Sequence, residues 1–160
     1  MRNLFCVAVL LFAIGAPAVF SQEAAEQVKG EPVTATANAI VYVYRYKQFA
    51  GYAVEPSVYC NEVQLARMDN GRYFKVALSP GTYTFRSNDK QSGIEMELKS
   101  GEEYYIRVEI AQGLLKQRGR LVLMAREQGA YEIKRLKPLG IDKIKDRERV
   151  VVDEAQPKGR

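Results

Sequence analysis

Residues 69–86 read DNGRYFKVALSPGTYTFR, and this stretch decides the fold. Asn70-Gly71 and Pro80-Gly81 are turn signals, and between them apolar and polar side chains alternate as they do in a half-buried strand. Alternation places every second residue on the same face of the sheet, so one face of this strand is predicted to be core. The residues of that face are Phe74, Val76 and Leu78.

Similar runs, separated by glycine turns, extend to both sides of this stretch. They predict an all-β fold, a single antiparallel β-sandwich of seven or eight short strands. The Asp69-Asn70-Gly71 turn is expected to close a hairpin. Residues 130–136 fit either a strand or a short C-terminal helix, and the pattern favours the helix. The expected strands are residues 40–46, 57–60, 62–67, 72–78, 82–86, 94–99, 104–110 and 121–125.

The ends of the chain differ in composition from its middle. Residues 1–21 have a positive start, an unbroken apolar run and small residues before a cut after Ser21 or, alternatively, Ala18, which indicates a secretory signal peptide. Residues 22–37 are expected to be a flexible leader, residues 38–136 the sandwich domain, and residues 137–160 a basic, mostly exposed tail. The protein is therefore expected to be exported, periplasmic or secreted, with no transmembrane segment after cleavage.

The sequence offers little for catalysis. It has no histidine, which removes the usual general base near neutral pH and the commonest metal ligand. Cleavage would leave Cys60 as the one remaining cysteine, either buried or available for an intermolecular bridge. Glu95 and Glu97 share one strand face and are more typical of a solvated face than of a glycosidase pair. No cofactor, metal site or enzymatic activity is predicted.

Two candidate binding surfaces emerge instead. Alternation places Tyr42, Tyr44 and Tyr46 on one face of the first strand, where they either form an outward row or pack under a neighbouring segment. Basic residues after residue 113 supply the second surface. Those of the tail, from Lys134 on, either contact anionic lipid, lipopolysaccharide phosphates or acidic cell-wall polymers, or are simply solvated. Those in and beside the loop of residues 113–119 would instead be presented to the active site of another protein. Those singled out are Lys116, Arg118, Arg120, Lys134, Arg135 and Lys137.

Four segments carry a resemblance to a known family: AIVYVYR (residues 39–45), NGRYF (70–74), LSPGTY (78–83) and SGEEYYIRV (100–108). Together they resemble the bacterial domain of unknown function family 2846, with a weaker likeness to proline-glycine-rich PEGA-type modules. The resemblance implies an exported or lipid-anchored envelope protein with a β-sandwich core and no assigned activity. This chain departs from the lipid-anchored members because it lacks a cysteine at the cleavage site.

Three classes of function remain open at this level. The favoured one is a non-enzymatic envelope binding or accessory module that contacts a polymer, anionic lipid or protein, and nucleic acid is not an expected partner. The second is a periplasmic inhibitor or chaperone-like protein acting through the loop of residues 113–119. The third is a carboxylate-based glycan hydrolase using Glu95 and Glu97.

Overall fold

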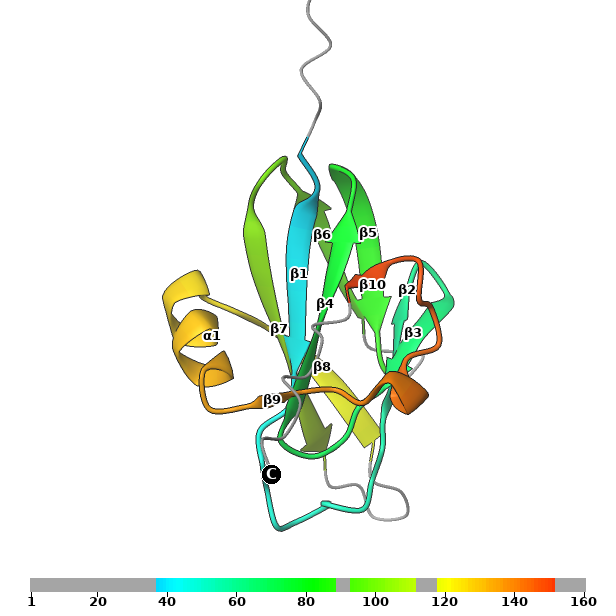
Figure 1. Ribbon diagram of the computed structural model, residues 1–160, viewed down its shortest axis with the longest axis vertical. Helices are drawn as coiled ribbons and strands as arrows, with labels where there is room; N and C mark the ends of the chain where they lie inside the picture. Colours follow the sequence, from blue (N-terminus) through cyan, green and yellow to red (C-terminus); the bar gives the residue numbers. More distant parts are fainter. Residues whose placement is uncertain (1–36, 89–92, 112–117, 152–160) are drawn as a thin grey trace, which may run out of the picture. The chain divides into compact units, whose positions relative to one another are not determined.

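The computed structural model describes residues 37–88, 93–111 and 118–151, which build two β-sheets around a shared core (Figure 1). Alternating sequence produces the strands, because each buries one face of its pleat and leaves the other polar. The strands are β1 (Ala39–Tyr44), β2 (Ser57–Cys60), β3 (Val63–Arg67), β4 (Arg72–Leu78), β5 (Gly81–Arg86), β6 (Gly93–Leu98), β7 (Glu103–Ala111), β8 (Arg118–Met124), β9 (Lys137–Pro138) and β10 (Val150–Val151).

The larger sheet has six strands in the order β10-β4-β1-β7-β8, and β9 also pairs with β4. The smaller sheet has four strands in the order β3-β2-β5-β6. The predicted all-β sandwich is confirmed. Two pairs depart from an antiparallel arrangement, since β1 runs parallel to β7 and β9 runs parallel to β4.

The core lies between the two sheets and draws on the inner face of each. Phe74, Val76 and Leu78 of β4 are all buried, as predicted. Cys60 is buried with them and forms no disulfide, and burial raises the pKa of its thiol to about 11. Cys60 was predicted to be either buried or available for an intermolecular bridge, and the structure shows it buried.

The turn at Asn70-Gly71 forms, but the hairpin expected there is wrong. β3 belongs to the four-stranded sheet and β4 to the six-stranded sheet, so this turn carries the chain from one sheet to the other. Gly71 has φ +72°, which glycine adopts without steric cost. The true hairpin joins β2 and β3 through Asn61 and Glu62, both at positive φ.

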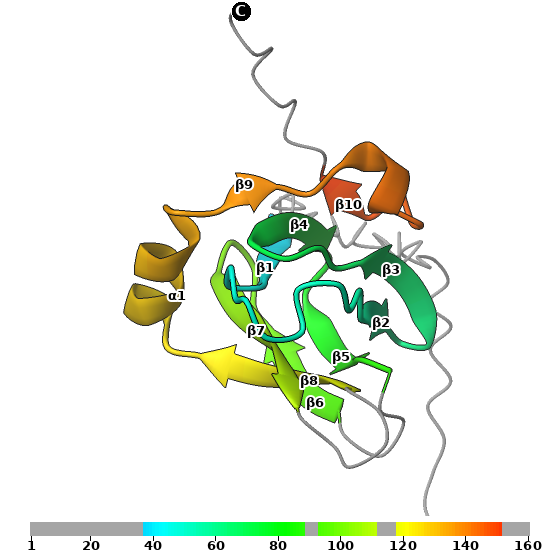
Figure 2. The same ribbon diagram turned by 90° about the horizontal axis from the view of Figure 1, so that it is seen from below.

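The helix predicted at residues 130–136 exists as α1 (Arg126–Ile133) and begins four residues earlier. It packs against β7, on the outer face of the six-stranded sheet (Figure 2). Gly129 makes the close approach possible, because a Cβ there would lie 2.3 Å from the Cβ of Tyr105.

The segment from Lys137 to Val151, called the strap below, contains β9, a short 3-10 helix η1 (Ile141–Lys143) and β10. Both of its strands pair with β4, and Ile144 forms a bridge with Ala66 of β3, so the strap runs across the edges of both sheets (Figure 2). The domain boundary predicted at residue 136 is therefore wrong. Most charged residues of the strap are exposed as expected, but Lys143 and Asp146 are half-buried, and Leu139, Ile144 and Val150 are in the core.

The predicted signal peptide and nearly all of the leader lie outside the described residues, as do residues 152–160. Within the part that is described, no helix is both long enough and apolar enough to span a membrane.

Candidate functional site

The loop between β1 and β2, residues 45–56 and called the end loop below, is held by a buried arginine. The side chain of Arg45 lies beneath the loop, and the residue is only 1% exposed. Its Nη2 donates to the carbonyl of Gly51 at 2.7 Å, and its Nη1 donates to the carbonyls of Val54 and, at 3.5 Å, Met68. Because Met68 follows β3, Arg45 ties the end loop to a second segment of the chain.

This burial of Arg45 carries a free-energy cost that the loop must offset. No carboxylate forms an ion pair with the guanidinium among the described residues, and its Nε has no hydrogen-bond partner there. Burial lowers the pKa of Arg45, and the charge of Asp69 opposes that shift. The guanidinium stays charged. A buried cation that loses its acceptors is strongly destabilising, so the loop is expected to stay closed over it.

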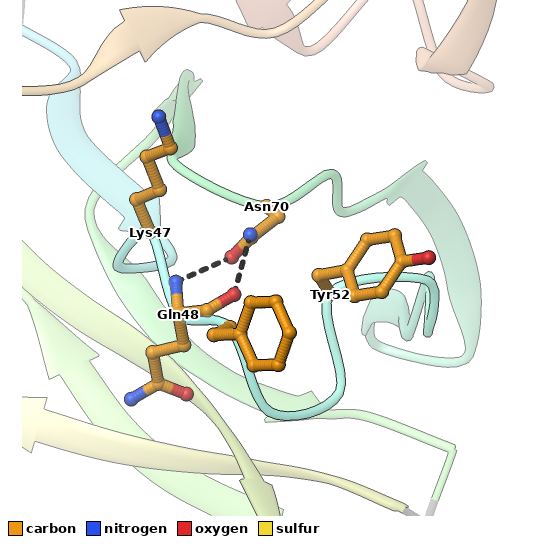
Figure 3. A pocket seen from close by; sticks show the side chains of 5 residues that line it. Lys47, Gln48, Tyr52 and Asn70 are labelled. Carbon is orange, nitrogen blue, oxygen red and sulfur yellow. Dashed lines mark hydrogen bonds between the residues drawn. The ribbon is translucent and has the colours of Figure 1, made fainter.

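Asn70 fixes the other side of the end loop. Its Oδ1 accepts a hydrogen bond from the Gln48 backbone N–H at 2.9 Å, and its Nδ2 donates to the Gln48 carbonyl at 2.7 Å (Figure 3). The Asn70 side-chain amide therefore makes the two hydrogen bonds with the Gln48 backbone that a neighbouring strand would otherwise make. The turn residues Asn70-Gly71 thus both redirect the chain and hold the loop beside it.

Two aromatic side chains project from the loop held in this way. Phe49 is 93% exposed and Tyr52 is 64% exposed. Their ring centroids are 6.2 Å apart and the ring planes differ by 28°. Beside them is a hollow of about 450 Å³, called the end-loop hollow below, in which Lys47 and Tyr52 lie on either side of Asn70 (Figure 3). Its lining residues are Lys47, Gln48, Phe49, Tyr52 and Asn70.

The charge around the end-loop hollow is positive. Lys47 and Lys137 both flank Gly71: a Cβ at Gly71 would lie 3.1 Å from the Cβ of Lys47, and the Lys137 N–H donates to the Gly71 carbonyl at 3.3 Å. The nearby carboxylates of Glu55 and Asp69 are paired with Lys143, at 2.7 and 3.6 Å. The hydrogen bond from Lys143 holds the pKa of Glu55 below its usual value.

An outward row of Tyr42, Tyr44 and Tyr46 is not what the structure shows. Tyr44 is fully buried, because α1 folds back over this face. Tyr42 stacks on Tyr105 of the neighbouring strand, with centroids 4.9 Å apart and planes 4° from parallel. Tyr46 is half-buried and meets the Tyr44 ring edge-on at 6.1 Å. Tyr42, Tyr44 and Tyr105, called the tyrosine face below, are thus largely packing surface.

Glu132 of α1 joins the helix to the tyrosine face. It accepts hydrogen bonds from the Tyr44 hydroxyl at 2.5 Å and from the Gln128 amide at 2.8 Å, and Arg107 lies 3.5 Å away. Burial by itself would raise the pKa of Glu132, but these donors, together with Tyr46, hold it below the usual value. Burial, reinforced by Glu132, raises the pKa of the Tyr44 hydroxyl.

The predicted basic residues do not form a single surface. Lys134, Arg135, Lys137 and Arg120 are exposed, and the backbone N–H of Lys137 bonds to Gly71, which follows the hollow residue Asn70. Arg135 instead donates to the Tyr131 hydroxyl at 2.9 Å and lies over that ring. Lys116, the side chain of Arg118 and most of the loop of residues 113–119 lie outside the described part of the chain.

The residues that line the end-loop hollow were not predicted from the sequence. The available signal was Gln48-Phe49-Ala50-Gly51-Tyr52, two aromatic residues in a glycine-containing segment between strands. Nothing in that pattern distinguishes an exposed loop aromatic from one that folds inward. Glu95 and Glu97 are exposed on β6, and no cluster of potential metal ligands occurs among the described residues.

Comparison with known proteins places the chain in one family. The family described as "Protein of unknown function (DUF2846)" matches residues 35–119, more than half of the chain, and the protein belongs to it. The predicted resemblance is thereby confirmed. The match covers β1 to β7, including the end loop, whereas α1 and the strap follow it in the sequence. No curated protein and no solved structure matches the chain.

Proposed function

We propose that this family member is an exported, non-enzymatic binding module of the cell envelope, and that it contacts its ligand through the end loop. The observation that carries the proposal is the pair Phe49 and Tyr52, held in solvent beside a hollow by Arg45 and Asn70. Single exposed aromatic residues need no explanation. Two adjacent ones on a loop fixed by buried and paired polar groups form a surface preorganised for contact.

Export rests on the signal-peptide pattern of residues 1–21. It is tested by expressing the full chain in a bacterial host and sequencing the N-terminus of the recovered protein. A mature start at Gln22, or at Val19 for the alternative cut, supports export. Recovery of the intact chain in the cytosol would show that the protein is not exported and that the proposed envelope location is wrong.

Binding is tested by sedimentation of the processed chain, residues 22–160, with separated envelope fractions: insoluble cell-wall polymer, membrane vesicles and soluble protein. We expect one fraction to retain it, and the double variant Phe49→Ala/Tyr52→Ala to be retained about ten-fold less. Tyr131→Ala is the matched control, because Tyr131 is also an exposed aromatic residue beside a cation but lies on α1. Equal retention of the double variant and the control would remove the end loop from the proposal.

A further inference from the structure

We propose that the end-loop hollow binds a negatively charged pyranose ring, the repeating unit of an acidic polysaccharide. This inference rests on the proposed function, since it names the ligand of the same loop. Three properties of the hollow support it: its aromatic wall, its charge and its fixed shape.

The aromatic wall suits a sugar ring. A pyranose presents C–H groups on its faces and hydroxyls around its rim, so one face can lie on an apolar platform while the rim stays polar. Phe49 and Tyr52 are near-parallel neighbours and together form such a platform. The hollow, at about 450 Å³, falls in the size range of small-molecule sites.

The polar lining favours an anion over a neutral sugar. Lys47 lines the hollow, and its ammonium pairs with no carboxylate in the part of the chain that is described. The acidic groups nearby, Glu55 and Asp69, are already paired with Lys143. A carboxylate or phosphate on the sugar would complement the free ammonium of Lys47.

The fixed shape determines which groups face the ligand. Both ends of the Asn70 side-chain amide are bonded to the Gln48 backbone, so Asn70 shapes the hollow rather than binding in it. The side-chain amide of Gln48 has no partner among the described residues and can serve both sugar hydroxyls and a carboxylate. Because Arg45 and Asn70 already hold the loop, binding orders little additional chain.

The same features argue against a lipid surface as the partner. A membrane is met by apolar side chains that project beyond polar ones. Here Phe49 and Tyr52 project directly beside polar groups that line the same hollow, namely Lys47, Gln48 and Asn70. These groups would be desolvated without partners at the acyl-chain boundary.

The experiment compares three probes that separate ring from charge: oligogalacturonate, its methyl ester, and poly-glutamate of similar length. The isotope-labelled processed chain is titrated with each, and backbone and Gln48 side-chain amide resonances are followed. We expect oligogalacturonate to shift the resonances of residues 47–52, with the methyl ester at least five-fold weaker. Poly-glutamate, which has charge but no ring, should leave them unchanged.

Variants then assign the contacts. Phe49→Ala and Tyr52→Ala should each weaken oligogalacturonate binding about ten-fold, and Lys47→Gln about five-fold. Tyr131→Ala, an exposed aromatic residue beside Arg135, should leave it unchanged. Equal melting temperatures would show that each variant is folded.

Several outcomes overturn the inference. If poly-glutamate binds as tightly as oligogalacturonate, the hollow recognises negative charge and needs no sugar ring. If the methyl ester binds as tightly as oligogalacturonate, the hollow does not require a negative charge on the sugar. Binding to phosphatidylglycerol vesicles that requires Phe49, without any oligogalacturonate shift, would replace the sugar by a lipid surface and leave the proposed function intact. Envelope retention that is independent of Phe49 and Tyr52 would overturn both.

Discussion

The tyrosine face and the end loop both present clustered aromatic side chains, yet one is packing surface and the other is exposed. On the tyrosine face, Tyr44 is fully buried beneath α1 and Tyr42 stacks on a neighbouring ring. At the end loop, Phe49 and Tyr52 contact each other and little else. Tyr42 and Tyr44 of the tyrosine face lie only a few residues before the end loop in the sequence.

The comparison shows that exposure depends on what later folds over a residue. α1 reaches the tyrosine face through polar contacts, chiefly Glu132 with Tyr44, and through the close approach at Gly129. At the end loop, the buried polar group is Arg45, which holds the backbone and leaves the aromatic rings outside. Glu132 thus helps α1 to cover the tyrosine face, whereas Arg45 holds the end loop with Phe49 and Tyr52 exposed.

The largest difference is expected between alanine substitutions in the two regions. Tyr44→Ala removes a buried ring and leaves Glu132 without its closest donor, so the free energy of unfolding should fall by about 3 to 5 kcal/mol. Phe49→Ala removes exposed atoms and should change it by less than about 0.5 kcal/mol. Urea unfolding of both variants measures the contrast. Similar losses of unfolding free energy in Tyr44→Ala and Phe49→Ala would mean that the tyrosine face and the end-loop aromatic residues do not differ in packing.

This contrast also marks what could be predicted from the sequence. Alternation identifies the inner face of β4, including Phe74 and Val76, because a sandwich core fixes that register. It also places the tyrosines on the opposite face, but it cannot say that α1, some eighty residues later, covers them. The sequence of α1 has no apolar stripe from which its packing on the sheet could be predicted, because its buried residues are Gly129 and Glu132.

A smaller effect is expected from Gly129→Ala. The added Cβ would clash with the Tyr105 side chain at 2.3 Å, so α1 must shift, at a cost of about 1 to 3 kcal/mol. The tyrosine face should then gain hydrogen exchange and solvent access, while the end loop keeps its ligand. Hydrogen exchange of α1 and binding by the end loop measure the two sides. A simultaneous loss of binding would show that the regions are coupled.

The strap, like α1, covers part of the sheet in a way that its sequence pattern does not predict. Its charged composition predicted an exposed tail, and most of those charged residues are exposed, with Lys143 and Asp146 half-buried. Its isolated apolar residues, Leu139, Ile144 and Val150, are nevertheless enough to join the core. Their spacing follows neither a strand nor a helix period, because the strap only touches the core at intervals.

Arg45→Met should have a mainly local effect. The change removes a costly buried charge but leaves the carbonyls of Gly51 and Val54 without their donor, so the net loss of unfolding free energy should be about 1 kcal/mol. The end loop should exchange amide hydrogens faster, and its ligand affinity should fall. Unchanged exchange at residues 47–54 would mean that Asn70 alone holds the loop.

The smallest effect is expected from acid, and on the tyrosine face it should come from Glu132. The pKa of Glu132 is held below its usual value of 4.5, so its ionised form contributes stability above about pH 4.5 that is lost as the pH falls through the folded-state pKa. The groups that face it are Tyr44 and Tyr46 from the β1 side, Gln128 on α1, and Arg107 on β7, itself paired with Glu109. Protonation weakens the hold of α1 on Tyr44.

Arg45 has no comparable transition in acid, because its guanidinium stays charged throughout. Between pH 5 and pH 3, Tyr44 and α1 resonances should therefore shift before those of residues 47–52. The matched variant Glu132→Gln, which cannot titrate, should remove the early shift and lower stability at pH 7 by about 1 kcal/mol. If the early transition survives in Glu132→Gln, another carboxylate governs it, with Glu55 the one to substitute next because its pKa is also lowered.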